Sequence, residues 1–265
     1  MAVVALVPVR AVPAPEVVAE QPMDRANLPA YELIQRQAAR LAPAREWLYR
    51  QVRLSDRHCV LDLGCGHGVV SSELRELSAG QVVALDRNPT SMIRMPAAFS
   101  DTYPACATAE RLPFADNTFD LVFCQLALLW MPLPATVAEI GRVVQPGGAV
   151  VAIEPDYGGM IEYPARIATR DLWIAGLQRA GADPYVGRKL PILLAQQGFE
   201  IRTDLMSQLT APVPERFDLL RGLPLTDAER AHLDRIQKYV EDLTTPWAQL
   251  IHLPFFFLSG ELPGS

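Results

Sequence analysis

The sequence lacks any apolar run long enough to cross a membrane, for which a helix needs about 20 residues. Its longest late apolar run, Leu253 to Leu258, is interrupted by Pro254. The residues 1–22, rich in Ala, Val and Pro, contain no basic cluster followed by the apolar core of a signal peptide. We therefore predict a cytoplasmic protein that does not bind membranes, in which residues 1–22 form a flexible arm.

Cysteine is scarce as well. Only four cysteines occur, at positions 59, 65, 106 and 124, and no two of them have C-x-x-C spacing. Three lie in apolar stretches typical of strands, a pattern that favours buried free thiols in a reducing compartment. We expect no metal ion in this protein.

Positive charge is in deficit. The chain has 24 Lys and Arg against 30 Asp and Glu, which gives a net charge of −6 and a pI near 5.3. A protein that binds nucleic-acid phosphates unaided needs a basic surface, so we expect no nucleic-acid partner. Half of the 265 residues are hydrophobic and a fifth are charged, as in a soluble globular protein with one large α/β domain.

The most informative stretch runs from Val60 to Val70 and reads V-L-D-L-G-C-G-H-G-V-V. It predicts a buried strand over 59–63, a glycine loop, and a helix over 69–78. Glycines leave no Cβ between the loop and a ligand, and the start of a helix favours negative charge. The stretch therefore predicts a site for an anionic group; the alternative is a tight strand-to-helix turn without a ligand.

The glycine spacing distinguishes between classes of ligand. Dinucleotide enzymes carry G-x-G-x-x-G, whereas this chain has D-x-G-x-G-x-G over 62–68 with no glycine at 69. That pattern resembles motif I of the class I S-adenosylmethionine-dependent methyltransferases, in their small-molecule branch with the ubiquinone and menaquinone C-methyltransferases. The resemblance covers about residues 55–205 and implies S-adenosylmethionine as the cofactor.

The resemblance also implies cofactor contacts. Asp86 ends a second strand predicted over 81–85 and is placed to bind the ribose hydroxyls; the alternative is a helix cap. Gln125 ends the fourth strand, near the sulfonium. The segment 109–114, A-E-R-L-P-F, resembles the adenine-binding segment, with Thr108 where relatives have Asp. The expected cofactor residues are Asp62, Gly64, Cys65, Gly66, Gly68, Asp86, Arg87, Ala109, Glu110 and Gln125.

Alternating strand and helix patterns predict the fold class: an α/β fold with a doubly wound, mostly parallel seven-stranded sheet. We expect helices over 28–52, with Pro43 opening a second short helix, and a third strand over 106–109. Residues 247–260 are predicted as one last strand, which the resemblance makes antiparallel to the others.

The predicted organisation is a single domain over 23–265. Its N-terminal helices (28–52) precede a cofactor-binding core over 55–160 and 187–210, completed by the last strand over 247–262. Helical inserts over 161–186 and 211–246 interrupt the strand–helix alternation. We expect them to form a lid that shapes substrate choice.

Several side chains in the second half of the chain are candidates for catalysis and substrate binding. A methyl on a sulfonium is already activated, so catalysis needs an acceptor placed behind it, water excluded and, for some acceptors, a base. The candidate catalytic residues are His252, Glu154 and Asp156. The candidate substrate-binding residues are Tyr157, Trp173 and Arg188.

These observations predict a methyltransferase acting on an oxygen, or a carbon or nitrogen, of a small-molecule metabolite, as a monomer or homodimer. One alternative is methylation of a modified tRNA or protein residue, which the acidic balance disfavours. Another is a non-catalytic subunit that keeps the cofactor fold. A NAD-dependent dehydrogenase is disfavoured by the glycine spacing.

Overall fold

The computed structural model describes residues 31–89, 102–206, 209 and 212–264. The predicted arm over 1–22 lies outside these residues. None of the described helices combines the length and apolar character that a membrane span requires. The cytoplasmic location stays a prediction.

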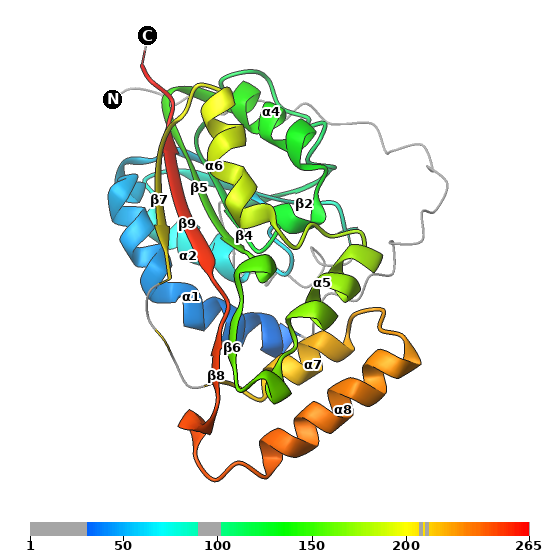
Figure 1. Cartoon of the computed structure of the whole chain (residues 1–265). Coiled ribbons are helices and arrows are strands. Elements are labelled where there is room, and N and C mark those ends of the chain that lie inside the picture. Colours follow the sequence, from blue (N-terminus) through cyan, green and yellow to red (C-terminus); the bar gives the residue numbers. More distant parts are fainter. Residues whose placement is uncertain (1–30, 90–101, 207–208, 210–211, 265) are drawn as a thin grey trace.

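Helices and strands alternate through most of the chain (Figure 1). The helices are α1 Tyr31–Gln51, α2 Val69–Leu77, α4 Leu133–Val143, α5 Arg170–Arg179, α6 Val186–Gln196, α7 Glu215–Arg221 and α8 Asp227–Glu241. The strands are β1 Cys59–Leu63, β2 Gln81–Asp86, β3 Thr102–Cys106, β4 Phe119–Gln125, β5 Val144–Pro155, β6 Ile161–Tyr163, β7 Glu200–Leu205, β8 Leu250–His252 and β9 Phe255–Glu261.

Seven strands form one sheet in the order β3-β2-β1-β4-β5-β9-β7. Neighbouring strands from β3 to β5 are parallel, whereas β9 is antiparallel to both β5 and β7. The predicted fold class, a doubly wound and mostly parallel seven-stranded sheet, is confirmed. The carboxyl ends of β1, β2, β4 and β5 therefore meet at one edge, where ligands bind in such sheets.

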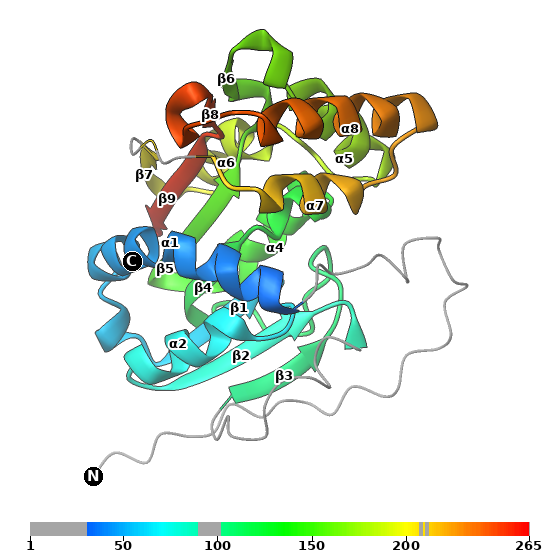
Figure 2. The same cartoon turned by 90° about the horizontal axis from the view of Figure 1, so that it is seen from below.

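Helices cover both faces of the sheet, as Figure 2 shows. On one face, Leu48 of α1 and Leu74 of α2 pack against Val60 and Phe123. On the other face, Ile140 of α4 and the side chains of α6 belong to a larger apolar cluster. The central strands are buried on both sides, which explains their nearly continuous apolar sequences.

The third strand differs from its prediction over 106–109. β3 runs over Thr102–Cys106 because it follows the ladder of β2, in which Val82 pairs with Thr102 and Asp86 with Cys106. Pro104 lies within β3, which is an edge strand, where proline is tolerated. Residues 107–110 consequently form a loop beyond the strand.

The first helix also differs from its prediction. Pro43 does not open a second helix but lies inside α1, which is continuous from Tyr31 to Gln51. Proline removes one helical hydrogen bond. Arg45 Nη1 donates to the Ala38 carbonyl at 2.6 Å in this part of the helix. Burial of Leu41 and Leu48 on the same face holds both halves against the sheet.

The predicted last strand over 247–260 is wrong as a single element. It divides into β8 and β9 at Leu253 and Pro254, since proline has no N–H for a ladder. Only β9 joins the main sheet. β8 leaves that sheet and pairs with β6, and His252 lies opposite Ile161.

We call the part of the chain formed by β6, α5, α7, α8 and β8 the lid. It lies beyond the carboxyl end of β5 in both views (Figures 1 and 2). Trp173 of α5 and Leu233 of α8 are buried in the same apolar cluster as the sheet. Closure of the lid over a substrate stays a prediction.

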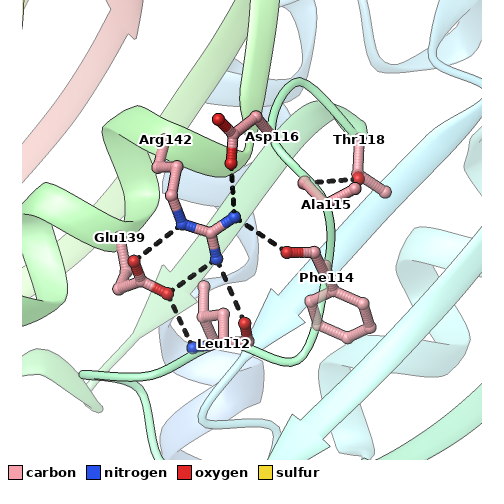
Figure 3. Close-up of polar contacts among 7 residues, drawn as sticks. All are labelled: Leu112, Phe114, Ala115, Asp116, Thr118, Glu139 and Arg142. Carbon is pink, nitrogen blue, oxygen red and sulfur yellow. Dashed lines mark hydrogen bonds and ion pairs between the residues drawn. The ribbon is translucent and has the colours of Figure 1, made fainter. Parts of the chain in front are cut away.

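Arg142 of α4 connects this helix to the loop before β4 (Figure 3). Its guanidinium donates to Glu139 through Nε and Nη2, both at 2.8 Å, and to the carbonyls of Leu112 and Phe114. It also pairs with Asp116 at 2.8 Å. The hydrogen bonds to Glu139 raise the pKa of Arg142 above its ordinary value. One side chain thus fixes the loop over 112–116.

We predict that Arg142→Lys lowers the free energy of unfolding by about 1–3 kcal/mol, because an ammonium cannot reproduce a planar fork with several acceptors. Urea unfolding monitored by circular dichroism measures the change. Arg170→Lys is the control, since Arg170 makes one ion pair with the adjacent Asp171 and should behave like the wild type. Equal stability of both variants would contradict the importance assigned to Arg142.

Candidate functional site

The glycine loop lies at the carboxyl edge of the sheet, between β1 and α2. The amides of Gly64 and Cys65 both donate to the Leu85 carbonyl, at 2.8 and 3.0 Å. Gly64, Gly66 and Gly68 all have positive φ, at 80°, 50° and 74°. Only glycine adopts such a series readily, which explains the motif in terms of the backbone.

Two glycines of the loop differ in what surrounds them. A Cβ on Gly64 would overlap the Cβ of Ala127, so this glycine is required by packing against the loop after β4. A Cβ on Gly66 would meet no protein atom within 4 Å. The absence of a side chain at Gly66 therefore leaves open space at the carboxyl edge, as expected for a residue that lies against a ligand.

Asp86 connects the end of β2 to the glycine loop. Its Oδ2 accepts the amide of Gly66 at 2.9 Å, and its Oδ1 accepts the amide of Asn88 at 2.8 Å. Each carboxylate oxygen accepts more than one hydrogen bond. The side chain therefore retains acceptor capacity for ligand hydroxyls. Its predicted role at a ribose stays a prediction, as does that of the exposed Arg87 beside it.

Asp62 of β1 supports the loop from beneath. It is 3% exposed and accepts the Ser71 hydroxyl at 2.5 Å, which joins β1 to α2. Burial raises the pKa of Asp62 to about 7, opposed by the Ser71 hydrogen bond. Burial, with help from the nearby carboxylates, also raises the pKa of the Cys65 thiol. Cys65 is therefore not a thiolate nucleophile.

Arg45 is a site residue that sequence reasoning missed. It is 3% exposed, pairs with Glu73 of α2 at 2.6 Å, and donates through Nη1 to Gln125 Oε1 at 3.1 Å. Gln125 is the last residue of β4, so Arg45 orients its carboxamide at the carboxyl edge. A signal existed in the sequence: Arg45 falls on the buried stripe of α1 that includes Leu41 and Leu48.

The predicted adenine-binding residues lie in the loop after β3. Ala109 is 5% exposed and belongs to the main apolar cluster, whereas Glu110 is exposed. The amide of Ala107 donates to the Asp86 carbonyl at 3.3 Å. This bond places the start of the loop beside the end of β2, and Arg142 holds its continuation.

α1 approaches the glycine loop through its first residue. The ring of Tyr31 packs edge-on against His67, with centroids 5.8 Å apart. His67 is 6% exposed, and its buried Nδ1 has no hydrogen-bond partner within the described part of the chain. Arg36, by contrast, is engaged in an ion pair with Glu215 of α7 at 3.1 Å.

Glu154, a predicted catalytic residue, is fully buried near the end of β5. Its Oε1 accepts the amides of Ala127 and Leu128, at 2.9 and 2.8 Å, and its buried Oε2 has no partner among residues 31–89, 102–206, 209 and 212–264. Burial raises the pKa of Glu154 to about 7. This geometry favours a structural role in holding the loop after β4. A catalytic role stays a prediction.

Asp156 and Arg188 were predicted as a base and as a substrate ligand, but they are bonded to each other. Arg188 Nε and Nη2 donate to the two oxygens of Asp156 at 2.5 and 2.9 Å. Asp156 is 3% exposed and also accepts the Gly158 amide. Both functional groups are therefore committed to fixing the turn after β5, which favours structural roles.

The remaining candidates lie between the core and the lid. The rings of Tyr157 and Trp173 pack together with centroids 5.1 Å apart, and burial raises the pKa of Tyr157. Trp173 is 8% exposed, so little of its ring is available to a substrate in this conformation. His252 lies half-buried in β8, within the small sheet. Among the described residues, no hydrogen bond or ion pair joins His252 to Glu154 or Asp156.

The residues at the carboxyl edge fit an organic cofactor with both an anionic and a hydroxylated part. Open space lies at Gly66, the start of α2 follows at Val69, and Asp86 offers carboxylate acceptors. The buried Nδ1 of His67 is a further polar atom that lacks a protein partner. No group of side chains among the described residues could hold a metal ion.

Comparison with known proteins agrees with this geometry. Residues 61–152 match a family model described as a methyltransferase domain. The human mitochondrial arginine-hydroxylase NDUFAF5 is 30% identical over 170 residues, which cover 62% of this chain and 48% of that protein. The chain thus spans about half the length of this relative. A malonyl-[acyl-carrier protein] O-methyltransferase from Erwinia billingiae is 29% identical and covers 71% of this chain and 74% of that protein.

A solved structure shares the fold. Phosphoethanolamine N-methyltransferase 2 from Haemonchus contortus, in complex with phosphomonomethylethanolamine and S-adenosylhomocysteine, superimposes with a TM-score of 0.61 at 14% identity. The match covers 91% of this chain and 60% of that one. These comparisons do not confirm the narrower resemblance to ubiquinone and menaquinone C-methyltransferases, which stays a prediction.

We predict that Glu154→Gln flattens the pH dependence of stability. Because burial raises its pKa to about 7, native Glu154 holds a proton that the unfolded chain releases near its ordinary pKa of about 4.3. The native state then binds more protons, so this group makes the free energy of unfolding fall as the pH rises from about 5 to 7. The substitution should remove about 1–3 kcal/mol of that fall.

Urea unfolding at several pH values across this window measures the effect. Glu200→Gln, an exposed carboxyl on β7, is the control and should retain the wild-type slope. Asp62 contributes a fall of the same sign in all three proteins. An unchanged slope in Glu154→Gln would show that Glu154 is ionised in the native state throughout.

Proposed function

We propose that this chain is a class I S-adenosylmethionine-dependent methyltransferase that transfers a methyl group to an oxygen of a small-molecule metabolite. The observation that carries the proposal is the open space at Gly66, bounded by Asp86 at the carboxyl edge of a methyltransferase sheet. A lid with apolar inner faces lies over the same edge.

S-adenosylmethionine supplies an activated methyl group on a sulfonium. The residues of this chain would bind and orient the reactants: the glycine loop and the start of α2 for the amino-acid end, and Asp86 for the ribose hydroxyls. Arg45 holds Gln125 at the end of β4, where its carboxamide would face the transferring methyl. Acceleration then comes from alignment and from exclusion of water by the lid.

Transfer to oxygen is supported by the chemistry that the site offers. Burial raises the pKa of the Cys65 thiol, so this group stays protonated, and the Asp62 carboxyl is buried and hydrogen-bonded to Ser71, so neither is available to deprotonate an acceptor. An acceptor that is already ionised needs no strong base. The O-methyltransferase from Erwinia billingiae gives independent support for this acceptor class. His252 is the candidate base for a phenolic acceptor.

Two alternative functions stay open as outcomes of the tests. A methyltransferase of tRNA or protein residues would need a basic or extended binding surface, which the net charge of −6 disfavours. A protein that keeps the fold but performs other chemistry has a precedent by name in the arginine-hydroxylase relative. The proposal includes action as a monomer or homodimer, without nucleic-acid or membrane partners.

We predict that Gly66→Val abolishes binding of S-adenosylhomocysteine while the protein still folds. The new side chain would occupy space that no protein atom fills, although the positive φ of Gly66 adds strain of about 1–2 kcal/mol. Gly64→Ala, which overlaps Ala127, should instead reduce stability directly. Calorimetric titration and thermal unfolding separate these effects. Normal binding by Gly66→Val would mean that this glycine serves the turn alone.

Asp86→Asn should weaken S-adenosylhomocysteine binding by about 1–3 kcal/mol, because one charged acceptor is lost while an oxygen remains for the Gly66 amide. NAD is the control ligand and should bind at least tenfold more weakly to the wild type. Equal affinities for the two ligands would overturn the cofactor assignment.

The reaction itself is tested with cofactor carrying a tritiated methyl group and fractionated metabolites. Radioactivity in a small molecule that is released by mild alkali would identify a methyl ester and support the proposal. Label in macromolecules alone, or none in any fraction despite cofactor binding, would reject it in favour of one of the alternatives.

A further inference from the structure

A guanidinium in the lid has N–H groups without acceptors. Arg216 lies in the first turn of α7, and its Nε and Nη1 atoms are buried and have no hydrogen-bond partner among the residues that the structure describes. Its Nη2 donates to Gln249 Oε1 at 3.1 Å, and Gln249 is 8% exposed. A buried donor without an acceptor is unfavourable, and more so when it carries a charge.

The carboxylates near Arg216 are engaged elsewhere. Glu162 is the acidic group that acts on Arg216 electrostatically. However, Glu162 accepts the amide and hydroxyl of Thr169 through Oε1 and the amide of Arg170 through Oε2. Glu215, the preceding residue, pairs with Arg36. Neither carboxylate neutralises the guanidinium directly.

Other arginines of this region have partners of their own. Arg221, one turn further along α7, pairs with Asp234 of α8 at 2.7 Å. Arg188 pairs with Asp156 and is half-exposed. Arg216 therefore differs from both in combining burial with unused donors. Its guanidinium also lies over the ring of Phe217, 4.5 Å from the centroid, which limits its rotation.

Arg216 is connected to the glycine loop and to the end of β5 through neighbouring residues. On one side, the ion pair of Glu215 with Arg36 connects α7 to α1, whose Tyr31 contacts the loop at His67. On the other side, its partner Gln249 precedes β8, which pairs with β6 just beyond the end of β5. Figure 2 shows α7 between α1 and the outer lid helices α5 and α8.

We propose that Arg216 binds an oxyanion of the methyl acceptor, with Gln249 holding the guanidinium in place. The acceptor is then an acid, whose carboxylate or phosphate oxygens fill the donors of Nε and Nη1. The inference rests on the proposed function, since it assigns the acceptor of that same site. It also explains why a cation with two buried nitrogen atoms is retained in the lid.

The test uses the full chain saturated with S-adenosylhomocysteine and measures melting temperature at constant ionic strength. The probes are inorganic phosphate and linear monocarboxylates from acetate to octanoate, each acid compared with its neutral primary amide and with chloride. At least one oxyanion should raise the melting temperature of the wild type, because its binding stabilises the native state by mass action. The matching neutral amide and chloride should not raise it. Whether phosphate or a carboxylate does so identifies the class of acid.

The variants separate the proposed role from a merely structural one. Arg216→Gln should weaken the apparent affinity for the stabilising anion at least tenfold, and Arg216→Lys should retain part of it. Arg221→Gln, which removes an equal charge from the same helix, should respond like the wild type. If Arg216→Gln does not fold, the apparent anion affinity of Arg216→Lys is compared with that of the wild type, and a reduced affinity supports the proposed role.

Several results would overturn the inference. One is that no oxyanion raises the melting temperature of the wild type above that measured with its neutral amide or with chloride. Another is that the anion raises the melting temperature of Arg216→Gln as much as that of the wild type. A third is that Arg216→Gln loses S-adenosylhomocysteine affinity tenfold. The last result would assign Arg216 to the cofactor. Failure of the wild type to bind S-adenosylhomocysteine at all would instead reject the proposed function, so the two failures are distinguishable.

Discussion

A single carbonyl oxygen organises the candidate site. Leu85 O accepts the amides of both Gly64 and Cys65, at 2.8 and 3.0 Å, and so connects the end of β2 to the first turn of the glycine loop. The approach is possible because Gly64 has no side chain to collide with Ala127. Once this contact forms, the Gly66 amide meets Asp86, and the loop, the end of β2 and the loop after β4 become one unit at the carboxyl edge.

The parts predicted well from the sequence are those whose causes are local. The glycine loop, β1 and β2 follow from short motifs and apolar runs, and the topology follows from alternation and from the family resemblance. The errors arose for elements whose bounds are determined by contacts between residues far apart in the sequence. The pairing of β3 with β2 sets the bounds of β3, and α1 continues through Pro43 because both of its halves pack on the sheet. β8 leaves the main sheet because it pairs with β6.

The same distinction applies to the side chains of the site. Asp86 and Asp62 lie at the carboxyl edge as the motif implied, whereas Asp156 and Arg188, 32 positions apart, neutralise each other. No spacing rule reveals such a pairing. Arg45 and Arg216 were missed for a related reason, since a charged residue on a helix is assumed to face solvent. The apolar stripe of α1 offered a signal for Arg45, whereas only tertiary packing shows that Nε and Nη1 of Arg216 are buried.

The connection between core and lid has a mechanical consequence. β5 continues through the turn at Asp156 into β6, and β8 continues through Pro254 into β9, so two adjacent core strands extend into one two-stranded ribbon. The amide of Asp156 donates to the carbonyl of Pro254 at 2.9 Å, which joins the two turns. This ribbon is one of the connections between core and lid, since α5 is also followed by α6 and β7 by α7 along the chain. Because the β6–β8 ladder and the bond between Asp156 and Pro254 join the two strands, a change of angle where the ribbon leaves β5 and β9 would displace β6 and β8 together.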